Sequence, residues 1–498
     1  MQQHILIDKS GTLSQKLEQT VRQFPEANAL YIHERFYTYS RFWEMVQNVY
    51  LQIPRSTTFS RIGIYCNDDV YTYAAIVAVN AYGAAYVPLN KKNPVERNKI
   101  IVQESGIELL LTSIENSGLK TIAGNVEIVT IAGIEERSPS EIELKKINEV
   151  NQTCYILFTS GTTAAPKSIP VSNGNVNSFF NYYLSHYDFN ERDRFLQVYE
   201  LTFDVSVFSF FMPLLVGACC YVLPDTGIKF MKTAGYLQQH KITIVSMVPG
   251  ILSYLEQYLP EINLPELRYS FFSGDALYHS LAVKWNRSVT NAEIHNFYGP
   301  TETTIVCTRY IFNEEQSAEE SVNGIVPLGK AFDGMEFLIV DENNIPVEKG
   351  ELCFTGTQVI EAYLNGAHEE CFFNHKGKRY YKTGDVAAEN SNGNLVFYGR
   401  TDEQVKINGY RVELKEVEAA IEKISASKCK VIAVKDKNQR NTLCAFIALY
   451  EINKIQLINA LSAVLPDYMV PQEFISLDEF PLNLNGKIDK NKLIHLHK

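Results

Sequence analysis

Short apolar runs alternate with longer helical patterns over the first part of the chain. RIGIYC (61–66), IELLLT (107–112) and VEIVTI (126–131) predict strands, and an Ala-rich helical stretch follows the first of them. CYILFTS (154–160) predicts a further strand that ends in a polar loop, and Ser172 is placed to cap a helix through NVNSFFNYYLSHY. This alternation is typical of an α/β protein with parallel strands.

The pattern changes near residue 400, where shorter elements begin. The predicted elements are a strand QVKI (404–407), a helix with Leu414, Val417, Ile421 and Ile424 on one face, strands CKVIAV (429–434) and TLCAFIALY (442–450), and a helix through IQLINALSAVL (455–465). A unit of roughly 100 residues has the usual size of a domain. The sequence therefore predicts a large α/β body over 1–400 and a small α+β domain over 401–498.

Composition and charge narrow the class of protein. VFSFFMPLLVGACCYVL (207–223) is the most apolar segment, but Pro213 and Gly217 interrupt it and it is short for a membrane span, so we expect a buried helix followed by a buried strand. The N-terminus has no signal-peptide pattern, and nine cysteines without a CxxC pair are typical of reduced thiols. A net charge of −11 argues against nucleic acid as a partner. We expect a cytoplasmic protein with no membrane partner.

Five polar stretches carry candidate chemistry. LFTSGTTAAPKSIPVS (157–172) supplies hydroxyls, backbone N–H groups and one lysine after a strand, which suits a polyphosphate, although the spacing is not that of a Walker loop and a plain polar loop has the same composition. The other stretches are NFYGPTETT (296–304), YYKTGDVA (380–387), GRTDEQVKINGYRVELKEVE (399–418) and NLNGKIDK (483–490).

In this order the five stretches resemble the adenylate-forming (ANL) superfamily. More narrowly they resemble the amino-acid adenylation domains of nonribosomal peptide synthesis and stand-alone amino acid–carrier protein ligases, including the D-alanine–carrier protein ligases. The resemblance extends to NAYGAAYVPLN (80–90), FDVSV (203–207), GELCFTG (350–356) and LPDYMVPQEF (465–474). It implies ATP-dependent activation of an amino acid as aminoacyl-AMP with release of pyrophosphate. Transfer to the phosphopantetheine thiol of a separate carrier protein would follow.

The resemblance also implies a set of ATP contacts. The β- and γ-phosphates would be held by Thr159, Ser160, Gly161, Thr162, Thr163 and Lys167. Tyr298 would stack on adenine with Asn296 near the exocyclic amine, and Asp385 and Arg400 would hold the ribose. The alternatives are ordinary ones, a core aromatic for Tyr298 and a turn cap for Asp385.

The same resemblance assigns the reacting centre and a hinge. Thr301 would lie at the α-phosphate, and Glu302 would bind Mg²⁺. Lys487 would bridge the substrate carboxylate and the α-phosphate, where negative charge develops. The mobile small domain would rotate about Asp402 between the two half-reactions, replacing Lys487 by a face near Gly409.

The phosphate loop departs from the family pattern at two positions. Ala164 and Ser168 stand where the family has glycine. An alanine resists positive φ and close approach of a phosphate, which could slow or abolish the first half-reaction. We expect the loop to tolerate the change, because Lys487, Asp385 and Glu302 are all present.

The resemblance places a substrate pocket after FDVSV. Asp204 would pair with the α-ammonium of an amino acid, although an aspartate before an apolar helix can also be an N-cap. The remaining pocket positions are Val205, Phe208, Ser246, Phe271, Ser273, Phe297, Ile305 and Val306. Three phenylalanines fill volume, so we expect alanine, serine or glycine as the substrate, with proline next.

Two other functions stay open at this point. An acyl- or aryl-CoA synthetase of the same superfamily would use free coenzyme A and would not depend on Asp204. A non-catalytic family member would bind nucleotide without turnover, as Ala164 and Ser168 could suggest. The chirality of the substrate, the carrier, the pathway and the oligomeric state are not encoded in any motif that we recognise.

Overall fold

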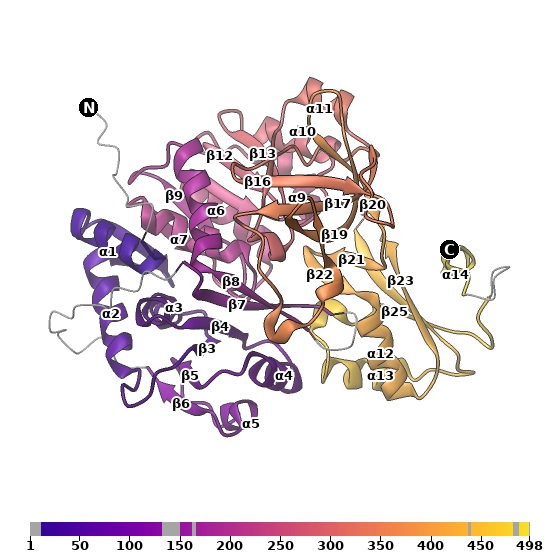
Figure 1. Cartoon of the computed structure of the whole chain (residues 1–498), viewed down its shortest axis with the longest axis horizontal. Coiled ribbons are helices and arrows are strands. Elements are labelled where there is room, and N and C mark those ends of the chain that lie inside the picture. Colours follow the sequence, from indigo (N-terminus) through magenta and orange to yellow (C-terminus); the bar gives the residue numbers. More distant parts are fainter. Residues whose placement is uncertain (1–10, 132–149, 162–165, 437–439, 482–487, 498) are drawn as a thin grey trace. The chain divides into compact units, whose positions relative to one another are not determined.

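The computed structural model describes residues 11–131, 150–161, 166–436, 440–481 and 488–497 (Figure 1). The chain forms two compact units. The first comprises Met1–Lys91, Ser105–Leu157 and Ser168–Thr401, and the second comprises Lys92–Glu104, Phe158–Lys167 and Asp402–Lys498. Residues 92–104 and 158–167, which fall within the predicted body (1–400), therefore group with the C-terminal residues instead.

A six-stranded sheet contains the predicted alternation. Its order is β6-β5-β3-β4-β7-β8, and the β3–β4, β3–β5, β5–β6 and β4–β7 pairings are parallel. Its strands are β3 (Arg61–Cys66), β4 (Ala85–Asn90), β5 (Leu109–Thr112), β6 (Glu127–Thr130), β7 (Thr153–Thr159) and β8 (Lys167–Ser172). The apolar runs that predicted strands are therefore strands, and the expected α/β class is confirmed.

A nine-stranded sheet has a parallel centre and positions the site. Its strands are, in spatial order, β15 (Lys330–Ala331), β14 (Thr308–Ile311), β13 (Glu293–Tyr298), β12 (Tyr269–Phe272), β11 (Ile244–Met247), β9 (Arg194–Gln197), β10 (Cys219–Val222), β1 (Asn28–Ile32) and β2 (Arg35–Thr38). From β13 to β1 every pairing is parallel. The carboxyl ends of these parallel strands consequently all lie along the same end of the sheet.

Helices join the strands of the first unit. They are α1 (Leu13–Gln23), α2 (Tyr39–Gln52), α3 (Val70–Tyr82), α5 (Leu119–Ala123), α6 (Asn173–His186), α7 (Val205–Leu215), α8 (Lys229–Gln239), α9 (Pro249–Leu255), α10 (His279–Ser288) and α11 (Glu314–Glu320). Ser172 caps α6 as predicted, since its side chain accepts a hydrogen bond from the backbone of Asn175. All residues of α7 are buried and β10 follows it, which confirms a buried helix and strand over 207–223.

A five-stranded antiparallel sheet completes the first unit. It consists of β16 (Met335–Val340), β17 (Lys349–Gly356), β18 (Phe372–His375), β19 (Lys378–Glu389) and β20 (Leu395–Arg400). The long strand β19 pairs with β17, β18 and β20. Register places Asp385 directly opposite Arg400, so this sheet joins two of the predicted ATP ligands.

The second unit is α+β, as its sequence predicts. It contains the hairpin β21 (Gln404–Ile407) and β22 (Tyr410–Glu413), the sheet of β23 (Cys429–Lys435), β24 (Asn441–Ile447) and β25 (Glu473–Ser476), and the helices α4 (Val95–Ser105), α12 (Leu414–Ser425), α13 (Lys454–Ser462) and α14 (Lys490–His497). Leu414, Val417 and Ile421 are buried. Ile424, the fourth residue of the predicted apolar face, also lies in α12 and is 37% exposed.

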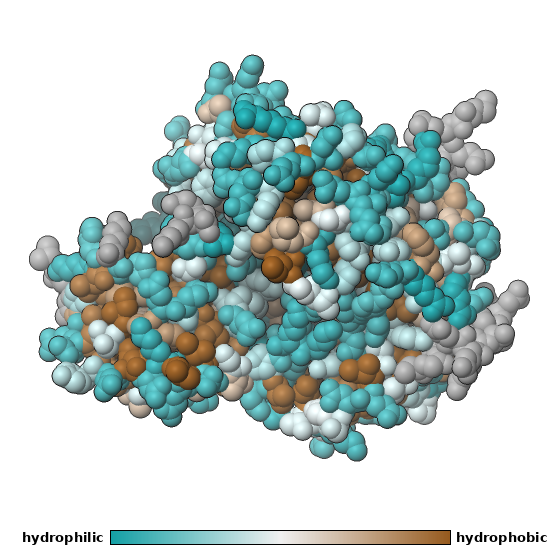
Figure 2. Space-filling view, turned by 180° about the vertical axis from the view of Figure 1, so that it is seen from behind, coloured by the Kyte–Doolittle hydropathy of each residue, from teal (hydrophilic) through white to brown (hydrophobic). Residues whose placement is uncertain are grey.

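The face shown in Figure 2 is mostly hydrophilic, with several apolar patches. Among the helices that the structure describes, none has the length and apolar character needed to cross a membrane.

Candidate active site

Several predicted pocket residues lie at the carboxyl edge of the nine-stranded sheet. Ser246 is in β11, Phe271 in β12 and Phe297 in β13, and Ser273 directly follows β12. Ser246 is opposite Phe271 in the register of β11 and β12. In open α/β sheets, ligands bind outside the carboxyl ends of the strands. The sheet therefore brings these side chains to the edge where a ligand is expected.

Aromatic rings fill much of this region. The ring of Phe271 lies 5.9 Å from that of Phe208 in α7 and 5.2 Å from that of Phe297. Tyr183 in α6 contacts all three rings, at 4.6 Å from Phe208, 6.1 Å from Phe271 and 5.5 Å from Phe297. The eight predicted pocket positions after Asp204 are each at most 6% exposed. The predicted phenylalanines therefore form one packed cluster, with Tyr183 as a fourth member.

Asp204 immediately precedes α7 but does not cap it. Its own backbone is helical (φ −62°, ψ −35°), and its side chain makes no capping hydrogen bond to the first turn of α7, all of which is described. Burial raises the pKa of the Tyr199 hydroxyl, and the negative charge of Asp204 raises it further. Burial and the charges of Tyr86 and Asp204 likewise raise the pKa of Tyr155. The negative charge of Asp204 thus raises the pKa of two buried tyrosines, and its side chain does not cap α7.

Tyr199 lies near Asp204 and near Ser246 and Ser273, the two serines predicted for the pocket. Its side chain is 9% exposed, and burial raises the pKa of its hydroxyl, an effect that hydrogen bonding by Ser246 and Ser273 partly offsets. Three hydroxyls in one buried region can donate and accept further hydrogen bonds, so this group is suited to a polar ligand.

The backbone of the TETT segment is tightly folded. Thr301–Thr303 form a 3₁₀ turn, and Thr304 and Ile305 follow it with φ of 58° and 74°. Positive φ is rare for a β-branched residue, and such strain clusters at functional sites. A Cβ at Gly299 would lie 2.5 Å from the Cα of Val306, so glycine is required there.

Glu302 lies within this turn and is fully buried. Its Oε1 accepts a hydrogen bond of 2.6 Å from the hydroxyl of Tyr363. Carboxylate oxygens are the ligands that Mg²⁺ prefers, so the chemistry of this side chain fits the ion that the resemblance implies. Thr301 is the first residue of the same turn and directly precedes Glu302.

Tyr298, Asp385 and Arg400 form one polar group in the first unit. The hydroxyl of Tyr298 donates to Oδ2 of Asp385 at 2.5 Å, and the guanidinium of Arg400 donates to Oδ1 at 2.6 Å. Burial and the Asp385 charge together raise the pKa of Tyr298 well above its usual value. Asp385 lies within a strand and is not a turn cap.

Asn296 precedes this group on β13 and is 3% exposed. Its amide nitrogen donates to the carbonyls of Pro327 at 2.9 Å and Val326 at 3.3 Å. These two bonds fix which way the amide faces and leave its oxygen as the acceptor for a ligand amine.

Phosphate-loop residues belong to the second unit and contact residues 411–416. Ser160 donates to the carbonyl of Arg411 at 2.6 Å, and the Gly161 N–H donates to Glu416 at 3.0 Å. Lys167 lies 4.0 Å from Oε1 of Glu413. The Gly161 N–H and the Lys167 side chain therefore each face a carboxylate, as expected of groups that can bind an anion.

Thr159 and Ser168 lie at the two ends of the loop. Thr159 carries a buried hydroxyl without a hydrogen bond to the described residues, and Ser168 is buried within β8. Thr162, Thr163, Ala164 and Lys487 lie outside the described residues.

Comparison with known proteins decides the family. Residues 17–364 match the family of AMP-binding enzymes. The chain is 34% identical to gramicidin S synthase 1 of Brevibacillus brevis over 87% of this chain and 39% of that protein. It is 31% identical to zwittermicin A synthase ZmaJ of Bacillus cereus over 87% of this chain and 84% of that protein. The chain belongs to the AMP-binding enzyme family.

The fold of this AMP-binding enzyme is that of adenylation domains. The Vibrio cholerae adenylation domain AlmE, solved in complex with glycyl-adenosine-5'-phosphate, matches with a TM-score of 0.85 and 25% identity, covering 100% of this chain and 99% of that one. The chain spans only 10% to 46% of the length of five synthases that it matches. Family and fold identify an ATP-using, adenylate-forming ligase.

Three tyrosines of this AMP-binding enzyme were not anticipated from its sequence. Tyr183 packs on the pocket phenylalanines, Tyr199 lies beside the pocket serines, and Tyr363 binds Glu302. The chain has 29 tyrosines, and nothing local distinguishes these three from ordinary core residues. Tyr199 had one weak signal, since it lies five residues before Asp204 in the same connection.

Proposed function

We propose that this enzyme activates a small amino acid with ATP as aminoacyl-AMP and then transfers it to the phosphopantetheine thiol of a separate carrier protein. The observation that carries the proposal is the placement of Asp204. Its carboxylate does not cap α7, and its charge acts on buried tyrosines beside the pocket. A charge in such a place suits the α-ammonium of an amino acid, which a fatty or aryl acid lacks.

The size of the substrate follows from the aromatic cluster. Phe208, Phe271, Phe297 and Tyr183 pack against one another, and in the proposed pocket they would leave little room for a large side chain. Alanine, serine and glycine are the favoured substrates, with proline next. The glycyl adenylate in the AlmE complex supports a small side chain.

Hydroxyl groups favour serine within this set. Tyr199, Ser246 and Ser273 offer three hydroxyls in a buried region. The hydroxyl of a serine substrate would add a hydrogen bond to this group. Alanine or glycine would add none, and a site built to bind a hydroxyl discriminates against analogues that lack it.

In the first half-reaction, a carboxylate oxygen of the amino acid attacks the α-phosphorus of ATP, and pyrophosphate leaves. Catalysis of this kind depends on alignment and on charge stabilisation more than on covalent help. Asp204 would hold the ammonium, Asn296 and Tyr298 the adenine, and Asp385 with Arg400 the ribose. Residues of the loop from Thr159 to Lys167, with Thr163 and Thr162 among them, would hold the phosphates.

Three residues would compensate the negative charge at the reacting centre. Thr301 and Lys487 would stabilise the negative charge that develops at the α-phosphate. Glu302 would hold Mg²⁺, which when bound neutralises phosphate charge. The carboxylate is buried and oxygen-donating, and Tyr363 fixes its orientation.

The second half-reaction requires the small domain to move. The boundary between the two compact units falls between Thr401 and Asp402, which supports a hinge at Asp402. Its side chain accepts a hydrogen bond from the backbone of Gln404 at 3.1 Å, a turn contact that a change of backbone dihedral would break. The role of Lys487 and of a separate carrier protein rests on the resemblance described above.

Trapping of the acyl-adenylate with hydroxylamine tests the proposal. The enzyme, ATP and magnesium are incubated with each of a panel of L- and D-amino acids and with fatty and aryl acids. We expect hydroxamate from small amino acids only, and loading of a phosphopantetheinylated carrier in a second assay. Hydroxamate from fatty or aryl acids alone, with thioester formed on coenzyme A, would indicate an acyl-CoA synthetase instead. A complete lack of hydroxamate would indicate a non-catalytic family member.

A further inference from the structure

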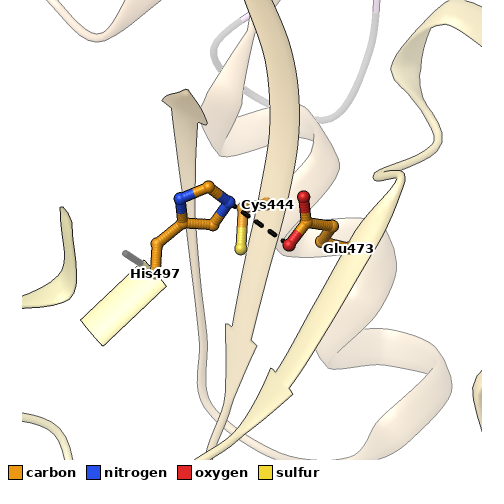
Figure 3. Close-up of side chains that lie close together, drawn as sticks. All are labelled: Cys444, Glu473 and His497. Atoms are coloured by element: carbon orange, nitrogen blue, oxygen red, sulfur yellow. Dashed lines mark ion pairs between the residues drawn. The ribbon is translucent and has the colours of Figure 1, made fainter. Parts of the chain in front are cut away.

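A thiol, a carboxylate and an imidazole meet on one face of the small sheet in the second unit (Figure 3). They belong to Cys444 in β24, Glu473 in β25 and His497 in the last turn of α14. Their possible ligand atoms all lie within 4.8 Å of one another. None of these residues takes part in the reaction proposed above.

The fold places the three side chains together for identifiable reasons. Cys444 and Glu473 are direct partners in the parallel register of β24 and β25, so they point to the same face of the sheet. Leu493 is fully buried in the cluster that covers this face. His497 follows it by four residues and therefore lies on the same side of α14.

Their geometry is close to that of a tetrahedral metal site. Nε2 of His497 lies 3.2 Å from Oε2 of Glu473. Bond lengths of about 2.0–2.2 Å in a tetrahedron separate such a nitrogen and oxygen by about 3.4 Å. A sulfur at about 2.3 Å from the ion would lie about 3.6 Å from each of them, and since the ligand atoms are within 4.8 Å of one another, the thiol needs to approach by no more than about 1 Å.

The surroundings of the imidazole fit a metal ligand. Nε2 of His497 is buried, and its ion pair is with the carboxylate of Glu473, a side chain that is 56% exposed. A divalent cation would bind this nitrogen and supply the positive charge that a thiolate beside a carboxylate requires.

We propose that Cys444, Glu473 and His497 bind a zinc-like divalent transition-metal ion. The combination of sulfur, nitrogen and oxygen donors suits borderline-soft Zn²⁺ and is unsuited to Mg²⁺ or Ca²⁺, which bind oxygen. On binding, the Cys444 thiol loses its proton to solvent and forms a sulfur–metal bond, and water occupies the fourth position. The ion would fasten α14 to the sheet formed by β24 and β25.

Titration of the metal-free full chain with Co²⁺ and Zn²⁺ tests the proposal directly. A thiolate bound to Co²⁺ gives a near-ultraviolet charge-transfer absorption, whereas an ion pair between His497 and Glu473 alone gives none. We expect one equivalent of Co²⁺ to produce this absorption and one equivalent of Zn²⁺ to abolish it. Zinc should also raise the unfolding temperature of the chain by mass action.

Matched variants separate this site from other thiols and imidazoles. His497→Ala and Cys444→Ala should each weaken Zn²⁺ binding at least ~100-fold and remove the absorption, since losing a group that only orients a metal ligand already costs about 10–100-fold. His495→Ala, an exposed histidine of the same helix, and Cys429→Ser, a buried cysteine of the neighbouring strand, should bind as the parent does. Should Cys444→Ala fail to fold, His497→Ala and Glu473→Gln decide the matter.

Three results would overturn the proposal. They are the absence of a charge-transfer absorption at one equivalent, equal zinc affinity in the parent and in His497→Ala, and loss of binding in the His495→Ala control. None of these readouts depends on adenylation.

Discussion

Replacing Asp204 by alanine separates a substrate contact from a helix cap. Asp204 precedes α7 but makes no capping hydrogen bond to its described first turn. The substitution therefore removes no helix cap, and the loss of a carboxylate near the helix N-terminus should cost ~0.3–1 kcal/mol. Losing a charge-assisted contact to the substrate ammonium should cost about 1.5–3 kcal/mol. Since about 1.4 kcal/mol is tenfold, kcat/KM for the amino acid should fall ~10- to 150-fold.

Asp69→Ala is the matched control, because Asp69 is a true cap. Its carboxylate accepts hydrogen bonds from the backbone of Thr72 at 2.9 Å and from the hydroxyls of Thr72 at 3.1 Å and Ser113 at 2.5 Å. Removing it should lower the free energy of unfolding by about 2 kcal/mol. It lies outside the proposed site, so kcat/KM should stay within about twofold of the parent.

Two measurements on both variants complete this test. Urea unfolding is followed by the fluorescence of Trp43 and Trp285, which both lie in the first unit. Amino-acid-dependent formation of AMP gives kcat/KM, with the des-amino acid of equal size as a second substrate. The parent should discriminate against the des-amino acid, and Asp204→Ala should lose that discrimination. An unchanged kcat/KM in Asp204→Ala would refute the reasoning, and so would undiminished discrimination against the des-amino acid.

Three further substitutions address other parts of the site. Tyr199→Phe removes one of the three buried hydroxyls and should reduce the preference for serine over alanine ~10-fold in kcat/KM; an unaltered ratio would contradict a role for this hydroxyl. Asp385→Asn weakens the contact with Arg400 and the proposed ribose contact, so the KM for ATP should rise ~10-fold with little change in the KM for the amino acid; equal increases in both would argue against a ribose role. Lys487→Ala should abolish adenylate formation and leave transfer from preformed adenylate mostly intact, and equal loss in both steps would contradict domain rotation.

Local patterns were sufficient to predict much of the fold. The run RIGIYC is β3 (Arg61–Cys66) to the residue, because apolar side chains on both faces are typical of a buried parallel strand. Ser172 caps α6 because its hydroxyl and the side chain of Asn175 satisfy each other's backbone donors. Such signals depend on a few neighbouring residues, so the sequence displays them directly.

Contacts between distant residues could not be predicted in this way. Arg97 and Glu416 are both buried and form an ion pair, although 319 residues separate them. Nothing in the local sequence around Arg97 indicates that residues 92–104 group with the C-terminal part of the chain. Burial of charge depends on the partner, and a sequence read segment by segment does not reveal the partner.

Some residues of the candidate site could be predicted from the sequence and others could not, for a related reason. Asp385 and Arg400 are recognisable by motif, and their pairing follows from the register of β19 and β20. Tyr199 and Tyr183 acquire their importance only from what surrounds them in space. Glu302 was predicted as a ligand, but its buried contact with Tyr363 depends on a residue 61 positions away. The type of a residue indicates which contacts its side chain can make, whereas the fold determines which side chains lie close enough to act together.

Amino-acid-dependent exchange of radioactive pyrophosphate into ATP tests the central claim most directly, because it reports reversible formation of the adenylate and needs no carrier protein. We predict exchange that requires a small amino acid, is strongest with serine, alanine or glycine, and is lost when Asp204 is replaced by alanine. Exchange that is absent with every amino acid, or that is supported only by fatty or aryl acids, would contradict the proposed function.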